Sequence, residues 1–326
     1  MTYNLKKALF LGVALTLSSC QSTAIPEWVT QPNVETNEHY FVVGQGRNIL
    51  QAQNNALSQI TKRLWTQVES SSYSRNILRQ TNSDENFQSL NDLKIKTKTA
   101  PVILSGAHFT KSKKIDEYTY YVEAKISKSD IAYQLERELN EIEAEAKRQL
   151  HALSSTDPLV WWLRNRNVNQ VRANALTRST MLAAVSEQPS LTWMPVVNEL
   201  QRKVDAVKAS TVIYIKGSKR DKWMIKMLAN QLSQEGISTT SSPATQYSHE
   251  IIFDTDWRQQ YLMEAYITTV SANLLTRSKN SSVLGSHEVI ATGNSVSSYK
   301  MAQEGAARHF SHQLEEQGVW VALGIN

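Results

Sequence analysis

The chain has a single cysteine, Cys20, among its 326 residues. One cysteine cannot form a disulfide bond within the chain, and an unpaired thiol outside the cytoplasm is a liability unless it is used chemically. The chain also has little excess of either charge, because 35 basic residues against 30 acidic ones give a net charge of +5. No block of Lys and Arg is interleaved with aromatic residues, so the sequence predicts no nucleic-acid partner.

Long apolar runs are absent too, apart from one at the N-terminus. Lys6 and Lys7 precede the ten-residue apolar run Ala8–Leu17, and Ser-Ser-Cys follows at residues 18–20. A positive start and a short apolar core are typical of a signal peptide, and ten residues are too few to span a bilayer. Cleavage before Cys20 would remove two basic residues and bring the mature chain closer to neutral.

This leader resembles that of bacterial lipoproteins, whose lipobox ends in Leu, Ser or Ala, a small residue and Cys. The resemblance implies that residues 1–19 are a signal peptide, that Cys20 is acylated and binds membrane lipid, and that residues 20–25 are a tether. Two or more acyl chains anchor a protein firmly. Gln21 stands where the family's inner-membrane retention signal has Asp, which implies the outer membrane, facing the periplasm. The alternative is an ordinary cleaved signal with a leftover cysteine.

Residues 26–127 are predicted to form a small α+β domain. Tyr40–Val43 reads as a buried strand, and Gly44 and Gly46 supply the backbone freedom for a sharp turn into a helix. Apolar residues then recur at a spacing of three or four, with small alanines that would let the helix lie close to a sheet: Ile49, Ala52, Ala56, Leu57, Ile60, Leu64 and Val68.

Two strand-like runs complete this domain. Residues 101–109 and 117–126 are apolar or alternate, and the polar stretch 111–116 between them reads as a hairpin turn. In the second run Val122, Ala124 and Ile126 share one face, while Glu123 and Lys125 lie on the other. The order β-α-β-β predicts an antiparallel sheet covered on one face by the helix.

Gly44 and Gly46 could instead belong to a phosphate-binding loop. The dinucleotide fingerprint needs a third glycine where this chain has Ile49, and a Gly-Lys-Ser/Thr motif is absent. We therefore predict a structural turn at Gly44 and Gly46 and no cofactor.

The segments of this domain resemble a known family. They are Pro26-Glu27-Trp28-Val29, the strand into Gly44-Gln45-Gly46, the helix with Ala52 and Ala56, and the late Tyr-rich strand. Together they resemble the lipoprotein family typified by the twenty-kilodalton surface antigen of Helicobacter. The resemblance implies a dodecin-like β-α-β-β unit and an envelope- or flagellum-associated lipoprotein. It covers only this domain, and its motifs are structural.

Residues 128–209 are predicted to form a helical segment. A helix capped by Ser129 or Asp130 runs to about Leu150, with one apolar stripe and with Glu143 and Lys147 at a spacing of four. The stripe packs on its own chain or forms a coiled-coil seam with a second copy, which would make a homo-oligomer. It consists of Ile131, Leu135, Leu139, Ile142, Ala146 and Leu150.

Asp157 and Pro158 are predicted to begin the next helix, as N-cap and first residue. Its apolar run, residues 159–163 with Trp161 and Trp162, is either buried in the core or is an aromatic patch that faces a partner or a membrane. Two more helices are predicted at residues 171–186 and 193–207, with a break near Pro189.

Residues 210–326 are predicted to form a mixed α/β domain. Asp221 caps a helix that ends at Gly236, and its inward residues are predicted to be Trp223, Met227, Leu228 and Leu232. Strands are predicted at 211–215 and 249–254, and these two are expected to be parallel. Residues 261–277 and 287–296 are predicted to form an antiparallel hairpin, and residues 319–323 a last strand. A helix is predicted at 299–317. Gly293 precedes Ala302 and Ala306 much as Gly44 precedes Ala52 and Ala56. This half resembles the small α/β domain at the amino end of the TolB translocation protein and in periplasmic flagellar ring lipoproteins.

Candidate catalytic and metal-binding groups are few. His309 and His312 lie one helical turn apart without a third ligand. Asp254 and Asp256 lack the surrounding acidic loop of a calcium site. We therefore predict no metal.

Neither Ser105 nor Ser218 lies in a Gly-x-Ser-x-Gly elbow, and an acylated Cys20 could not be a nucleophile. We therefore predict no catalytic residue. These observations favour a non-catalytic outer-membrane lipoprotein that binds or scaffolds envelope proteins, with those of the flagellum as one candidate. The alternatives are a periplasmic hydrolase or ligand-binding protein, and a structural oligomer assembled through helix 131–150.

Overall fold

A computed structural model describes residues 24–70, 104–186 and 195–325. The predicted α+β class is confirmed, because the described residues form runs of helices and runs of strands, and the strands build two separate sheets. The chain divides into two compact units, one with Met1–Asn140 and Leu176–Leu191, the other with Glu141–Ala175 and Thr192–Asn326. Helices α5 (Lys128–Ala152) and α7 (Val168–Ser186) each contribute residues to both units.

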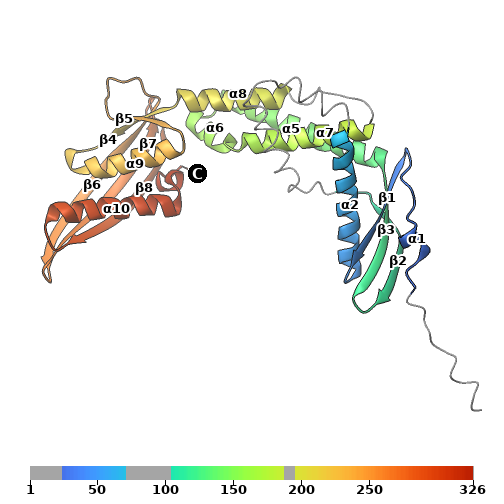
Figure 1. Ribbon diagram of the computed structural model, residues 1–326. Coiled ribbons are helices and arrows are strands. Elements are labelled where there is room, and N and C mark those ends of the chain that lie inside the picture. The colour runs from blue at the N-terminus through green and yellow to red at the C-terminus, as the bar shows by residue number, and fades with distance from the viewer. Residues whose placement is uncertain (1–23, 71–103, 187–194, 326) are drawn as a thin grey trace, which may run out of the picture. The chain divides into compact units, whose positions relative to one another are not determined.

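The first unit has a three-stranded antiparallel sheet in the order β1-β3-β2. Helix α2 lies along one face of this sheet, and the short helix α1 precedes β1 (Figure 1). Apolar residues of β1, β3 and α2, including Tyr40, Val122 and Ile60, are fully buried between them. A specific likeness to the dodecin unit stays a prediction. The bounds are α1 Glu27–Thr30, β1 His39–Gly46, α2 Ile49–Ser70, β2 His108–Asp116 and β3 Thr119–Ser127.

The hairpin turn predicted at residues 111–116 is wrong, because these residues form most of β2. The turn lies instead at Glu117 and Tyr118, where the Asp116 carboxylate accepts a hydrogen bond of 2.9 Å from the Tyr118 amide. Lys111, Lys113 and Lys114 made the stretch read as a loop. An edge strand carries such charges readily, since its outer side faces water.

The sharp turn predicted at Gly44 and Gly46 is displaced, because both glycines lie inside β1 and the chain turns at Arg47 and Asn48. Their role is close approach. A Cβ atom on Gly44 would lie 2.1 Å from the carbonyl oxygen of Ala52 in α2. The same contact recurs in the second unit, where a Cβ atom on Gly293 would lie 2.2 Å from the carbonyl oxygen of Ala302. In both units a strand glycine lets an alanine-faced helix pack against the sheet.

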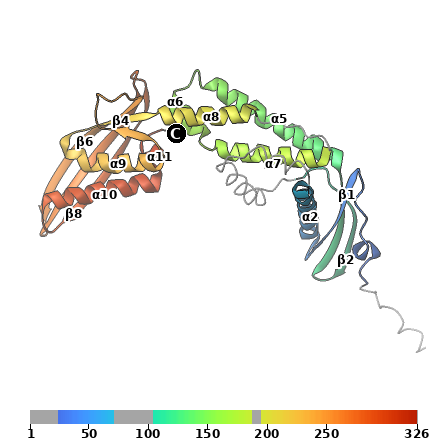
Figure 2. The same cartoon turned by 45° about the horizontal axis from the view of Figure 1, so that its top comes forward.

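The second unit has a five-stranded mixed sheet in the order β5-β4-β6-β7-β8. The predicted parallel pairing of strands 211–215 and 249–254 is observed between β4 and β6, and β7 pairs with both of its neighbours antiparallel. Helices α9 and α10 lie side by side over one face (Figures 1 and 2). The strands are β4 Val212–Lys216, β5 Ser238–Thr240, β6 His249–Leu262, β7 Ala265–Ser278 and β8 Val283–Ser295. The helices are η2 Lys219–Asp221, α9 Lys222–Gln234, α10 Tyr299–Gln317 and α11 Val319–Ala322.

Three predictions about the elements of this unit are wrong. The strand predicted at 319–323 is instead the short helix α11 with Leu323 as its C-cap, and Trp320 of this helix packs edge-on against Trp162. Trp223 is exposed and Met224 is buried in its place, whereas Leu228 and Leu232 are buried as predicted. The predicted hairpin of 261–277 with 287–296 does not start at Tyr261. Strand β6 continues to Leu262, and the first strand of this hairpin, β7, starts at Ala265.

Helices α6 (Pro158–Asn165) and α8 (Pro195–Ser210) also belong to the second unit, whereas Pro189 lies outside the described residues. Trp161 and Trp162 are buried, and the indole nitrogen of Trp161 donates to the Gln149 carbonyl over 2.6 Å. The prediction that this run lies in the protein's own core is therefore confirmed. Among the described helices, none has the length and apolar character needed to cross a membrane.

The stripe of α5 is largely buried within the chain. Ile131, Leu135 and Leu139 are buried in the first unit and Ala146 in the second. Intrachain packing thus uses most of the surface that a coiled coil would need, and homo-oligomerisation through this helix stays a prediction.

Candidate functional site

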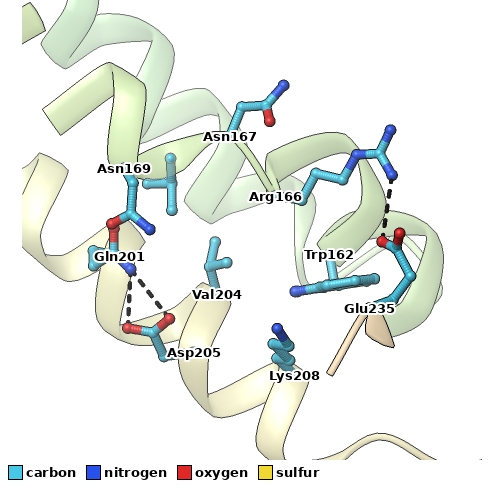
Figure 3. A pocket seen from close by; sticks show the side chains of 10 residues that line it. Trp162, Arg166, Asn167, Asn169, Gln201, Val204, Asp205, Lys208 and Glu235 are labelled. Carbon is cyan, nitrogen blue, oxygen red and sulfur yellow. Dashed lines mark hydrogen bonds and ion pairs between the residues drawn. The ribbon is translucent and has the colours of Figure 1, made fainter. Parts of the chain in front are cut away.

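A pocket of about 380 Å³ lies in the second unit, where the end of α6, the start of α7, α8 and the end of α9 meet. Its lining is mainly polar and charged, as Figure 3 shows. The side chains that set its chemistry are Trp162, Arg166, Asn169, Gln201, Lys208 and Glu235. The volume is that of a small-molecule site, although such sites are usually more apolar.

Opposite charges face each other across this pocket. Arg166 Nη1 lies 3.9 Å from Glu235 Oε2, which also accepts a hydrogen bond of 3.3 Å from the indole nitrogen of Trp320. The ammonium of Lys208 lies 5.7 Å from the ring centroid of Trp162. Gly236, at φ +76°, leaves room for Lys208, because a Cβ atom there would come within 2.5 Å of its Nζ.

Gln201, which lines the pocket, has a side-chain amide whose oxygen is buried and, among the described residues, unpaired. Gln201 Nε2 donates to both carboxylate oxygens of Asp205, over 3.1 and 3.0 Å. Within the described part of the chain, Gln201 Oε1 is buried without a hydrogen-bond partner. A buried unpaired acceptor costs about 1–3 kcal/mol. A ligand donor at this atom would remove that cost.

Asp157, His249 and Ser248 form a hydrogen-bonded array elsewhere in the second unit. Asp157 accepts from the backbone amides of α6 and lies 3.0 Å from His249 Nε2. His249 Nδ1 lies 2.8 Å from Ser248 Oγ. An ionised carboxylate only accepts hydrogen bonds, so Nε2 carries the hydrogen.

The pKa of Asp157 reflects opposing causes. Burial raises the pKa, but the hydrogen bond and charge of His249 and the amides of Val160 and Leu159 outweigh burial and lower it overall. The carboxylate is therefore held ionised, and it joins the start of α6 to the start of β6.

This array contains the residue types of a hydrolase triad, but a substrate could not reach its serine and histidine. Ser248 Oγ is held by both backbone groups of Val212, accepting from its N–H over 3.2 Å and donating to its carbonyl over 3.1 Å. His249 is only 2% exposed. A nucleophile must reach a substrate, so we assign the array a structural role.

Asp221 is a second polar centre whose role the sequence did not reveal. The prediction that its side chain caps α9 is wrong. The carboxylate instead accepts the amide of Ser218 in a capping box at η2. Oδ1 also accepts from Thr255 Oγ1 over 2.9 Å and from Trp257 Nε1 over 3.0 Å. This fully buried carboxylate fastens the loop after β4 to the middle of β6.

In the first unit, Glu123 holds the segment that follows the predicted tether. Glu123 is 1% exposed and accepts from Asn33 Nδ2 over 2.9 Å and from Thr110 Oγ1 over 2.6 Å. Lys111 Nζ lies 3.2 Å from the same carboxylate, and Lys128 pairs with Glu35 at 2.8 Å. Two of these contacts, through Asn33 and Glu35, fix the chain before β1 to the rest of the unit.

A second groove, of about 510 Å³, lies beside edge strand β1. Asn55 Nδ2 donates to the Gln45 carbonyl over 2.7 Å, and Arg63 Nη1 donates to the Phe41 carbonyl over 3.0 Å. These side chains of α2 occupy carbonyls that an edge strand would otherwise offer to another chain.

The residues considered from the sequence for catalysis or metal binding do not converge. His309 bonds to the backbone of Thr292 and to Gln313, and His312 pairs with Glu316 at 3.4 Å. In residues 24–70, 104–186 and 195–325 no three His, Cys, Asp or Glu side chains could share a metal ion.

The other candidates are equally separate. Asp256 pairs with Arg258, and Asp254 is exposed. Ser105 donates to the Gln134 side chain, and Ser218 accepts the Arg220 amide. Cys20, the predicted lipidation site, lies outside the described residues.

Comparison with known proteins gives little further information. No family model and no curated protein matches the sequence. A secreted protein from Helicobacter pylori aligns over 86% of this chain and 98% of its own, at 11% identity and a TM-score of 0.48. A minor lipoprotein from Acinetobacter baumannii aligns over 33% of this chain and 90% of its own, at 8% identity and a TM-score of 0.27. Both similarities are too low to carry an argument about function.

Proposed function

We propose that this chain is a lipid-anchored protein of the bacterial outer membrane, facing the periplasm, which acts as a non-catalytic binding or scaffold module. The observation that carries the proposal is the leader, in which Lys6 and Lys7, a ten-residue apolar core and Ser18-Ser19 precede the chain's single cysteine. Charge, core length, small residues and a lone Cys20 all agree with lipid attachment.

The contacts of the N-terminal segment support this proposal. The described chain begins at Ala24, four residues after Cys20, and such a stretch reaches at most about 14 Å. Asn33 and Glu35 then bind to Glu123 and Lys128. A lipid on Cys20 would therefore tether the first unit to the bilayer through a segment that is fixed to the protein at Asn33 and Glu35.

Lipid attachment can be tested by metabolic labelling with palmitate and by membrane fractionation. The wild-type chain should incorporate label and sediment with the outer membrane, whereas the Cys20→Ser chain should be unlabelled and uncleaved. A labelled Cys20→Ser chain, or an unlabelled wild type, would overturn the proposal. The comparison is direct, because the chain has no second cysteine that could take up the label.

The scaffold role needs its own test. Crosslinking on intact cells followed by mass spectrometry should recover envelope proteins, and deletion of the protein should impair envelope integrity. Motility of the same deletion strain tests the flagellar role, and normal motility would exclude that role. Normal detergent resistance, normal motility and no crosslinked partner together would contradict the scaffold role while leaving lipid attachment intact.

A ligand-binding role is the second candidate, and the pocket of Figure 3 favours it. The buried acceptor Gln201 Oε1, with the Arg166 and Lys208 cations nearby, suits a small ligand that carries a hydrogen-bond donor and a carboxylate. Thermal-shift screening with amino acids and short peptides tests this role. The expected result is stabilisation that is lost in Lys208→Gln.

A further inference from the structure

The turn between β6 and β7 carries highly exposed large apolar side chains. Met263 is 90% exposed, and Tyr261 and Leu262, which precede it, are more than half exposed. Val296, which follows β8, is 82% exposed. Scattered exposed apolar residues are ordinary, but a cluster of them at one protruding turn marks an interaction site.

Ring contacts hold this cluster together. Tyr261 lies 4.9 Å from Tyr266 between ring centroids, and Tyr266 lies 4.9 Å from Tyr299 at the start of α10. Tyr266 also pairs with Ser295, the last residue of β8, so Val296 leaves the sheet at the same place. We call Tyr261, Leu262, Met263 and Val296 the apolar tip.

The backbone at this tip is unfavourable for its sequence. Met263 has φ +51° and Glu264 has φ +60°. A two-residue hairpin with two positive φ values normally uses Asn and Gly, because a side chain with a Cβ atom is disfavoured there. The positive φ of Met263 costs folding stability, and its exposed side chain contributes no burial to offset that cost, which points to a contact made by this side chain.

Basic side chains surround the end of the sheet behind the tip. Arg220 lies 5.1 Å from the ring of Trp257, which is five residues before Leu262 on β6, a distance of about 17 Å along a strand. Lys219 and Lys222 flank Arg220, and Lys300 follows Tyr299. We call Lys219, Arg220, Lys222 and Lys300 the basic collar.

The views in Figures 1 and 2 place these parts together. The β6–β7 turn, the start of α9 and the start of α10 lie at one end of the second unit. The contacts of Asp221 with Thr255 and Trp257 fix the loop that carries the collar against β6. The loop that carries Lys219, Arg220 and Lys222 therefore lies at the same end of the second unit as the β6–β7 turn.

We propose that this end of the second unit binds an anionic lipid bilayer, with the apolar tip entering the headgroup region and the basic collar facing lipid phosphates. Tyrosines and exposed apolar side chains are favourable at a membrane interface, and nearby Lys and Arg attract anionic headgroups. Acidic residues also lie on these strands: Asp256 pairs with Arg258, whereas Asp254 and Glu264 are exposed and oppose the attraction of the collar to anionic lipid.

This contact is separate from the proposed acylation of Cys20, so it is tested on the mature chain that carries Cys20→Ser. The protein should sediment with vesicles of phosphatidylglycerol, and much less with vesicles of phosphatidylcholine. Raising the salt concentration should weaken the binding, because it screens the collar.

Two sets of variants test the tip and the collar. Leu262→Ser with Met263→Ser should lower the partition coefficient by roughly tenfold or more. Lys219→Gln with Lys222→Gln should lower it by roughly fivefold for each charge removed. The matched control is Val283→Ser, which removes a side chain that is 63% exposed at the β7–β8 hairpin and should change nothing. Unchanged thermal unfolding shows that each variant is folded.

A site-specific probe distinguishes insertion from simple charge attraction. In the Cys20→Ser background, Met263→Cys gives a unique thiol for an environment-sensitive dye, and Val283→Cys gives the control. The dye at residue 263 should shift to the blue on phosphatidylglycerol vesicles and the control dye should not. Absence of binding at low salt, equal binding of the Leu262→Ser, Met263→Ser variant, or no shift at residue 263 would overturn the proposal.

Discussion

Asp157 performs two tasks, and substitutions can separate them. It caps α6 through the amides of Leu159 and Val160, and it pairs with His249, which is 2% exposed. Asp157→Ser keeps an oxygen for the cap but removes the charge. Leaving the buried His249 Nε2 without its acceptor should cost about 1–3 kcal/mol, and Asp157→Ala should cost about 1 kcal/mol more because the cap is also lost.

The assay is urea unfolding followed by tryptophan fluorescence, because Trp161 and Trp162 lie in the helix that Asp157 caps. The matched control is Glu143→Gln, which breaks a pair of 3.1 Å with Lys147, a side chain that is 64% exposed. An exposed pair of this kind contributes about 0.3–0.5 kcal/mol. Equal midpoints for Asp157→Ser and Glu143→Gln would refute the reasoning.

The pH dependence gives a second check on Asp157. Its pKa in the folded protein is lower than in the unfolded chain, because burial, which raises the pKa, is outweighed by the interactions with His249 and with the α6 amides. Its contribution to stability is therefore present above the unfolded pKa of about 4 and is lost as the pH falls through the folded pKa. The stability difference between wild type and Asp157→Ser should shrink below about pH 4. A difference that does not change over this range would contradict the pairing.

Three further predictions concern the anchor and the first unit. Gln21→Asp should move the protein to the inner-membrane fraction of a density gradient, and an unchanged distribution would count against the lipoprotein leader. Gly44→Ala should cost about 3 kcal/mol or more in urea unfolding, since its Cβ atom would overlap α2, whereas Gly318→Ala meets no neighbouring atom and should cost about 1–3 kcal/mol for its positive φ alone. Glu123→Gln should cost about 1–3 kcal/mol, because Lys111 would lose its charged partner, and it should speed proteolysis of residues 24–38, because the acceptor for Asn33 would lose its charge. Unchanged proteolysis would show that Glu123 does not hold this segment.

Local patterns in the sequence predicted many elements well. The helix at 299–317 coincides with α10 because Ser298 caps it and Gly318 ends it. Asp157 and Pro158 begin α6 as expected, and Gly236 ends α9 with φ +76°. Caps and C-terminal glycines act within a few residues, so a sequence shows them directly.

The errors arose where a distant neighbour decides the structure. Lysines in residues 111–116 look like a turn until the strand is known to lie at the edge of a sheet. Residues 319–323 look like a strand until Trp320 is known to pack on Trp162. Position in a sheet and packing against remote segments are properties of the whole fold.

The candidate sites were even less visible in the sequence. The pocket joins Arg166, Lys208 and Glu235 from three separate segments. The array of Asp157 with His249 joins residues 92 positions apart. No periodicity or motif links such residues, because their proximity exists only after the helices pack.

The sequence by itself predicted the lipid anchor, and it determined the class of fold that the structure confirms. A signal peptide and a lipobox are read along an extended chain, and strand and helix periods depend on near neighbours. Only the tertiary structure decided that Asp221 and Glu123 are buried and paired, and that the apolar tip and the basic collar lie at one end of a sheet. Burial and charge clustering depend on which segments meet in space, and that is settled by packing.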